Sequence, residues 1–313
     1  MGEKGEIVKS IDQWKAEFLK SDLRALGRFI SLAENQEPAI VAILAELYEK
    51  IGNAKVIGIT GPPGAGKSSL TSHFVRLIRE RKKTVGVIAV DPVSPFTGGA
   101  LLGDRIRLAD HFNDPGVFIR SLSTRGKLGG LSLATREVVH LADAFGLDYL
   151  IVETVGVGQS EVDIRNIADA TLVVLVPEWG DAVQTLKAGL LEIGDVFIVN
   201  KSDREGADRI AGELRNMLQI AHKENTDVLL SSTQKPETVV ALFSAIEKYL
   251  LDHRERILEK RKSSARETAC ELMETLVTQE ARAWVNRQSK DTSNPYVFLQ
   301  NFMKVHPPGT LFK

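Results

Sequence analysis

Residues 61–68 read GPPGAGKS and fit the pattern G-x-x-x-x-G-K-S/T without a mismatch. A short apolar run at 56–60 precedes them and a helix-like pattern follows, so the order is strand, glycine-rich turn, helix. Glycines let the backbone curl around a polyphosphate with its N–H groups pointing inward, and the positive end of a helix dipole adds attraction. We therefore predict a phosphate site rather than a chance turn, made by Gly61, Pro62, Pro63, Gly64, Ala65, Gly66, Lys67, Ser68 and Ser69.

Several residues of the predicted site could also hold a divalent cation. Lys67 is placed to reach the β- and γ-phosphates, and the Ser68 hydroxyl is placed to bind Mg²⁺. Three carboxylates, Asp91, Asp104 and Glu153, lie on or next to loops that follow predicted strands. Nucleotide-bound Mg²⁺ takes one or two carboxylates with phosphate and water, so these oxygens form a candidate metal set.

Each carboxylate also has a purely structural interpretation. Asp91 precedes a proline and could only form a turn, and Asp104 could cap a helix. Glu153 closes a buried strand, where a charge needs a partner, so its structural interpretation is weaker. Gly156, just beyond it, could bring a backbone N–H close to the γ-phosphate in a loop that moves when that phosphate leaves.

The run Asn200, Lys201, Ser202, Asp203 is the N-K-x-D pattern of guanine recognition. The Asp203 carboxylate can accept from the guanine N1–H and exocyclic amine, the Asn200 side chain can contact the base edge, and the Lys201 stem can lie along the ring. Adenine would leave the carboxylate unpaired, so the pattern favours GTP over ATP. Ser231 and Ser232, after the last predicted strand, could add a backbone contact to the base.

These residues are predicted to lie at the ends of parallel strands. Short apolar runs alternate with helical patterns, which is typical of an α/β P-loop NTPase with a mainly parallel sheet and helices on both faces. In such sheets the ligand lies at the carboxyl ends of the strands. The predicted strands are 56–60, 85–90, 117–120, 149–152, 171–176, 196–200 and 228–230, with helices near 66–82, 103–112, 130–145, 160–168, 182–193, 206–222 and 236–253.

Composition and periodicity predict three segments. Residues 1–52 read as a helical N-terminal extension, 53–252 as the P-loop domain and 253–313 as a helical C-terminal segment. The charge run at 252–262 is expected to be a solvated helix face. The apolar stripe that follows has to pack on the body of the chain or on a second subunit.

The overall composition excludes several classes of protein. With 40 Lys and Arg against 41 Asp and Glu, the formal charge of −1 argues against nucleic acid as a main partner. The single cysteine, Cys270, rules out an internal disulfide and C-x-x-C motifs. The N-terminus has no apolar signal segment and no run is long enough to span a membrane, so we expect a cytoplasmic protein without a membrane partner.

Together the P-loop, the stretches AVDPVSPFTGGALLGDRIR (89–107) and VETVGVGQSE (152–161), and the N-K-x-D run resemble the MeaB/ArgK group of P-loop GTPases. These are the methylmalonyl-CoA mutase-associated G-proteins, and the resemblance covers roughly 20–280. It implies a homodimeric Mg²⁺-dependent GTPase, dimerising through the C-terminal segment. It also implies a chaperone for an adenosylcobalamin-dependent acyl-CoA mutase, which gates cofactor loading and protects or repairs the mutase.

The resemblance also implies a mobile third switch loop, PEWGDAVQTLKAG, at 177–189. In it Asp181, Gln184 and Lys187 match polar positions that couple the mutase to hydrolysis, although an exposed helix start explains Gln184 and Lys187 equally well. Glu178 and Trp179, and the chain after Arg287, depart from the family pattern.

We predict in-line attack of water on the γ-phosphate with slow intrinsic turnover. Lys67, Glu153, Asp181, Gln184 and Lys187 are its candidate catalytic residues, and Gln159 is a further candidate by location.

Three alternative functions remain open. A kinase would transfer the γ-phosphate to an acceptor, but nothing in the sequence suggests an acceptor pocket. A metal-insertion GTPase of the nickel type needs Cys and His ligands, and one Cys with six scattered His is a poor set. A non-hydrolysing dimeric scaffold is disfavoured by the intact magnesium motif.

Overall fold

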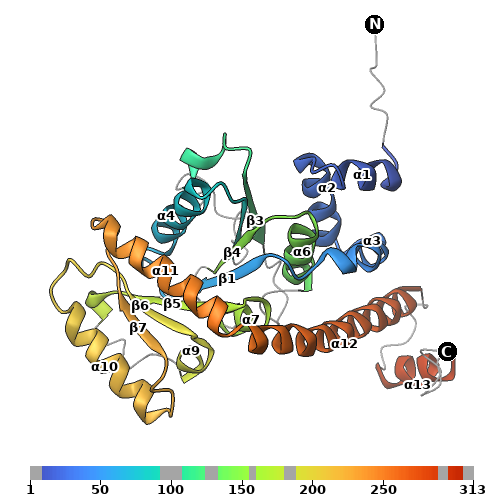
Figure 1. The fold of residues 1–313 in the computed structure, drawn as a ribbon. Helices are drawn as coiled ribbons and strands as arrows, with labels where there is room; N and C mark the ends of the chain where they lie inside the picture. Colours follow the sequence, from blue (N-terminus) through green and yellow to red (C-terminus); the bar gives the residue numbers. More distant parts are fainter. Residues whose placement is uncertain are drawn as a thin grey trace, which may run out of the picture. The chain divides into compact units, whose positions relative to one another are not determined.

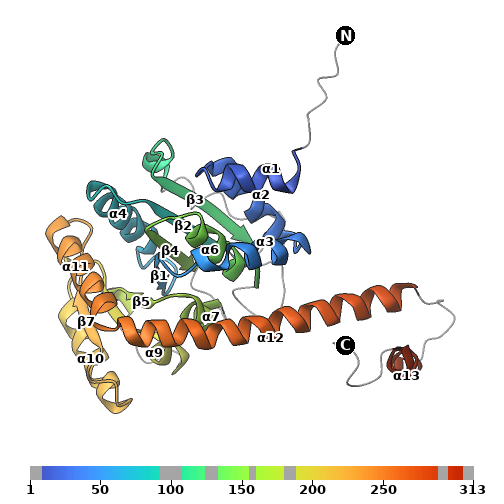
Figure 2. The same cartoon turned by 45° about the vertical axis from the view of Figure 1, so that its right-hand side comes forward.

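The computed structural model describes residues 9–91, 108–123, 133–154, 160–179, 188–287 and 295–305 (Figures 1 and 2). Its contacts separate two compact units, Met1–Ile257 and Leu258–Lys313.

A parallel β-sheet forms the centre of the first unit. In the described part of the chain it has seven strands in the order β3-β2-β4-β1-β5-β6-β7, and every neighbouring pair is parallel. Because the strands are parallel, their carboxyl ends meet at one edge. The strands are β1 (Lys55–Thr60), β2 (Val85–Asp91), β3 (Val117–Ser123), β4 (Tyr149–Thr154), β5 (Ala170–Leu175), β6 (Val196–Val199) and β7 (Asp227–Leu230).

Helices cover both faces of this sheet, which explains why its strands are apolar on both sides. Ile57 and Ile59 of β1 belong to a core with α4 and α11, whereas Val56 faces a core with α2 and α6. A third core packs α10 against β5 and β6 (Figure 1). The helices of the sheet region are α4 (Lys67–Glu80), α6 (Leu133–Ala144), α7 (Ser160–Ile167), α9 (Ala188–Ile193), α10 (Ala207–Ile220) and α11 (Pro236–Asp252), with 3₁₀ turns η2 (Ala109–His111) and η3 (Pro177–Trp179).

Three short helices and a 3₁₀ turn precede the first strand. They are α1 (Ile11–Phe18), α2 (Leu23–Glu34), α3 (Ala39–Leu47) and η1 (Tyr48–Lys50). Ser10 caps α1 through a capping box and Asp22 caps α2, so local sequence sets where both helices begin. The Phe18 ring packs against Phe29 and Phe145, with centroids 5.3 and 5.2 Å apart. The helices that precede the first strand therefore share the core around α6.

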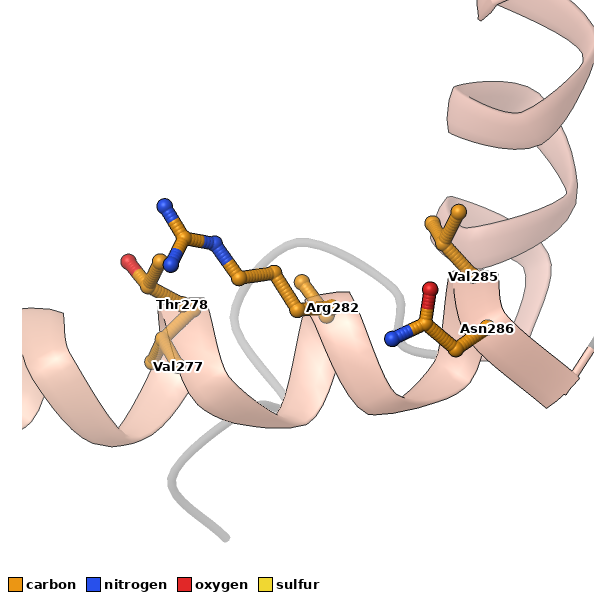
Figure 3. Close-up of a pocket in the computed structure, with 6 residues that line it drawn as sticks. Val277, Thr278, Arg282, Val285 and Asn286 are labelled. Atoms are coloured by element: carbon orange, nitrogen blue, oxygen red, sulfur yellow. The ribbon is translucent and has the colours of Figure 1, made fainter.

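The second unit is helical. It contains α13 (Pro295–Val305) and most of α12 (Arg254–Arg287), which begins in the first unit. Trp284 of α12 and Phe302 of α13 meet edge to face, with ring centroids 5.5 Å apart. A groove of about 480 Å³ runs along α12, and Figure 3 shows side chains that line it. Large apolar side chains stay exposed in this unit: Leu258, Met273, Leu276, Val285, Tyr296, Leu299, Met303 and Val305.

The predicted fold class is confirmed, because a parallel sheet is covered by helices on both faces with helices before and after it. All seven expected strands are present, each within three residues of its predicted limits. The helix expected at 182–193 is described only from Ala188, since 180–187 lie outside the described residues. Helix α13 lies within 253–313, the segment that we predicted to be helical, although the sequence after Arg287 departs from the family pattern. Among the described residues, no helix combines the length and apolar character needed to cross a membrane.

Candidate active site

The glycine-rich turn joins β1 to α4 in a backbone shape that only glycine adopts easily. Gly61 has φ +137° and Gly66 has φ +86°, both in the region that disfavours side chains. A Cβ on Gly61 would lie 2.1 Å from the Val174 carbonyl oxygen, and one on Gly66 would lie 2.4 Å from Asn200 Nδ2. The two glycines therefore let the turn pass close to β5 and to the residue after β6.

The turn leads directly into the N-terminus of a long helix. Gly66 is the N-cap of α4 and offers no side-chain hydrogen bond to the first turn. The N–H groups of this turn can therefore bind an anion, assisted by the helix dipole. Lys67 is buried, and its Nζ donates to the carbonyl oxygens of Gly61 at 2.7 Å and Pro62 at 3.0 Å. A buried ammonium and a helix N-terminus thus converge on the same turn.

Beside the turn, the Glu153 carboxylate accepts hydrogen bonds from two hydroxyls of α4. Ser68 Oγ donates to Oε1 at 2.6 Å and Thr71 Oγ1 donates to Oε2 at 2.9 Å. All three side chains are buried, with 4, 0 and 7% exposure for Ser68, Thr71 and Glu153. A hydroxyl beside a carboxylate is a hard oxygen set that suits Mg²⁺. The chemistry of these residues fits the predicted metal.

The ends of β1 and β4 are joined by a threonine pair. Thr154 Oγ1 donates to Thr60 Oγ1 at 3.0 Å, and both side chains are fully buried. Thr60 immediately precedes the glycine-rich turn, and Thr154 immediately follows Glu153. The pair fixes the spacing between the strand that carries the turn and the strand that carries the carboxylate.

Asn200 connects the N-K-x-D run to the glycine-rich turn. Its Nδ2 donates to the Ala65 carbonyl oxygen at 2.8 Å, and its side chain is 1% exposed. Its Oδ1 is buried without a hydrogen-bond partner among the described residues. Lys201 follows with φ +56°, an uncommon backbone conformation for a lysine. A strained turn with an unsatisfied buried acceptor is an arrangement that a ligand can complete.

Asp203 is exposed and is held by the segment after β7. The Ser232 hydroxyl donates to Asp203 Oδ1, and this bond lowers the pKa of the carboxyl below its usual range. Ser231 and Ser232 are themselves fully buried, and the Ser231 carbonyl accepts from the Ser202 N–H at 2.9 Å. Asp203 is therefore ionised at neutral pH and restrained, as an acceptor for two N–H donors should be.

The remaining predicted residues are only partly described. Asp91 is the last residue of β2 and lies in register with Ser123, so its backbone is at the same sheet edge. Pro62 and Ala65 are buried, whereas Pro63, Gly64 and Ser69 are exposed at the turn. The predictions for Asp104, Gly156, Gln159, Asp181, Gln184 and Lys187 lie outside the described residues.

Sequence reasoning missed Thr71 and the pair Thr60–Thr154. Thr71 lies one helical turn after Ser68, and that spacing alone places both hydroxyls on one face of a helix. It could have been found from the predicted helix. The threonine pair joins positions 94 residues apart and gives no local signal.

The whole arrangement can bind a guanine nucleotide and a divalent cation along one sheet edge. The family model described as "Methylmalonyl Co-A mutase-associated GTPase MeaB" matches residues 26–288. The chain belongs to this MeaB family of GTPases. It is therefore a GTP-hydrolysing enzyme of the P-loop class, as its glycine-rich turn and N-K-x-D run predicted.

Individual relatives agree with this membership. A protein of Pyrococcus abyssi is 45% identical over 289 residues, covering 88% of each chain. The GTPase ArgK of Escherichia coli is 34% identical over 278 residues, covering 87% of this chain and 82% of its own. The "Methylmalonic aciduria type A homolog, mitochondrial" of Mus musculus is 37% identical over 172 residues, covering 54% of this chain and 41% of its own.

Among solved structures, one titled as a LAO/AO transport system kinase superposes with a TM-score of 0.69. It covers 94% of this chain and 97% of its own at 24% sequence identity. At that identity the likeness establishes the shared fold alone.

Proposed function

We propose that this GTPase is a G-protein chaperone for an adenosylcobalamin-dependent acyl-CoA mutase. The observation that carries the proposal is the match of 263 residues, 26–288, to a mutase-associated GTPase family. The name of the mouse relative, which refers to methylmalonic aciduria, points to the same metabolism. In this role the protein gates cofactor loading and protects or reactivates the mutase, with GTP hydrolysis as its timer.

Hydrolysis would proceed by in-line attack of water on the γ-phosphate. Lys67 and the N–H groups of the glycine-rich turn would neutralise charge that develops on the phosphate oxygens, and the bond from Lys67 to the turn at the start of α4 supports this role. Ser68 and Glu153 would hold Mg²⁺, together with Asp91 and Asp104. A Mg²⁺ ion held by these residues would supply positive charge that offsets the negative charge of the phosphate oxygens.

Recognition of the base would rest on Asn200, Lys201 and Asp203, with Ser231 and Ser232 behind them. The hydrogen bond from Asn200 to the Ala65 carbonyl supports this assignment, because it ties base recognition to the phosphate turn. Asp181, Gln184 and Lys187 are proposed to complete the site when the mutase binds. The protein is proposed to act as a homodimer in the cytoplasm.

A capture experiment tests the proposal. The purified chain, loaded with GDP or with a non-hydrolysable GTP analogue, is used to capture partners from a native lysate. We expect a cobalamin-dependent mutase, identified by mass spectrometry, in an amount that depends on the nucleotide. The matched control is Lys67→Ala, for which that nucleotide dependence should disappear.

Two results would contradict the proposal. Capture of a hydrogenase or urease maturation factor instead of a mutase would favour metal insertion. Transfer of labelled phosphate from GTP to an acceptor, rather than release of free phosphate, would favour a kinase.

A further inference from the structure

Thr71 is a buried hydroxyl one helical turn beyond the phosphate-binding turn. Its side chain has no exposed surface and lies on the same face of α4 as Ser68, three residues earlier. The two hydroxyls donate to different oxygens of one carboxylate, Ser68 to Oε1 and Thr71 to Oε2 of Glu153. Glu153 comes from the end of β4, so a helix and a strand are joined at the predicted metal position.

The direction of these bonds has a chemical consequence for Ser68. A serine hydroxyl has one proton and two lone pairs, so a proton directed at Glu153 leaves the lone pairs for another partner, such as a cation. That orientation depends on where Glu153 Oε1 lies. The terminal side-chain torsion of a glutamate takes a broad range of angles, and a hydrogen-bond donor to the second carboxylate oxygen restricts that range.

We propose that Thr71 is a positioning residue for the magnesium site. The Thr71 hydroxyl holds Glu153 Oε2, and this keeps Glu153 Oε1 in the position where it accepts the proton of the Ser68 hydroxyl. The lone pairs of Ser68 Oγ are then oriented to bind Mg²⁺. The inference rests on the proposed magnesium role of Ser68 and Glu153. Thr71 acts through Glu153, as partners of metal-binding residues commonly do.

The experiment measures release of a fluorescent GDP analogue from the full chain over a range of buffered Mg²⁺ concentrations. Thr71→Val keeps the shape of the side chain and removes the donor, whereas Thr71→Ser keeps the donor. For Thr71→Val we expect the Mg²⁺ concentration that slows release by half to rise about tenfold or more. Release without Mg²⁺ should stay unchanged, and Thr71→Ser should approach the wild type.

A matched control is Thr171→Val in β5. Thr171 is also fully buried, but its hydroxyl has no hydrogen-bond partner among the described residues. This variant should behave as the wild type at every Mg²⁺ concentration. If Thr71→Val does not fold, the pair Thr71→Ser and Thr71→Ala gives the same comparison, because the two differ by a hydroxyl alone.

Different outcomes separate this inference from the magnesium assignment. If wild-type release does not respond to Mg²⁺, the proposed magnesium role fails and Thr71 has nothing to position. If the wild type responds and Thr71→Val has the same Mg²⁺ dependence, the role of Thr71 alone is overturned. An equal change in release with and without Mg²⁺ would also overturn it, because that indicates general damage to nucleotide binding.

Discussion

At the scale of single residues, the ionised Asp203 carboxylate should decide which base is bound. Asp203→Asn replaces the acceptor for the exocyclic amine of guanine with an N–H donor, which opposes that amine. We expect GDP affinity to fall at least about a hundredfold, and affinity for xanthosine diphosphate to rise, because xanthine offers a carbonyl at that position. Titration calorimetry with both nucleotides measures this. The exposed Asp208→Asn in α10 is the control, and unchanged GDP affinity in Asp203→Asn would contradict the assignment.

Glu137 in α6 should make stability depend on pH. Its side chain is 5% exposed, and burial raises the pKa of its carboxyl to about 7. The folded protein then keeps a proton that the unfolded chain releases near pH 4.5. The stabilisation is complete below that pH and is lost as the pH rises to about 7, by roughly 3 kcal/mol.

Urea unfolding at pH 5 and pH 8 tests this expectation for Glu137→Gln, which cannot ionise. Relative to the wild type, the variant should gain stability at pH 8 and gain little at pH 5. Glu224→Gln, at an exposed glutamate after α10, should show no such difference. A wild-type-to-variant difference that is the same at both pH values would show that Glu137 does not titrate in this range.

At the scale of elements, Asp143 near the end of α6 determines where the first strand begins. Its buried carboxylate accepts from the N–H groups of Gly52, Asn53 and Ala54 at 2.6, 3.1 and 2.8 Å. Asp143→Ala would leave these donors without their acceptor, at a cost of about 3 kcal/mol in the free energy of unfolding. Chemical denaturation measures the loss, with the exposed Asp227→Ala as control. Equal stability of the two variants would mean that the loop finds other partners.

At the scale of the whole molecule, the proposed homodimer should account for the exposed apolar side chains of α12. Met273 and Leu276 are each 50% exposed, and the groove of Figure 3 lies on the same helix. We expect light scattering to give about twice the chain mass of 34.4 kDa. Leu276→Glu should raise the dimer dissociation constant at least about tenfold, because it would bury a charge. Val240→Glu, on α11, is the control, and equal dimerisation of both variants would place the interface elsewhere.

The sequence by itself determined the fold class, the glycine-rich turn and the N-K-x-D run, because these depend on local backbone freedom and on the period of apolar residues. For example, the contiguous pattern G-x-x-x-x-G-K-S/T places glycine at positions 61 and 66, and both residues adopt a positive φ. Only the tertiary structure showed that Asn200 bonds Ala65 across 135 residues and that Thr71 meets Glu153 across 82. Such contacts depend on where a helix face meets the end of a distant strand. No local sequence pattern predicts such a contact. The burial of Glu137 could not be predicted from the sequence for the same reason.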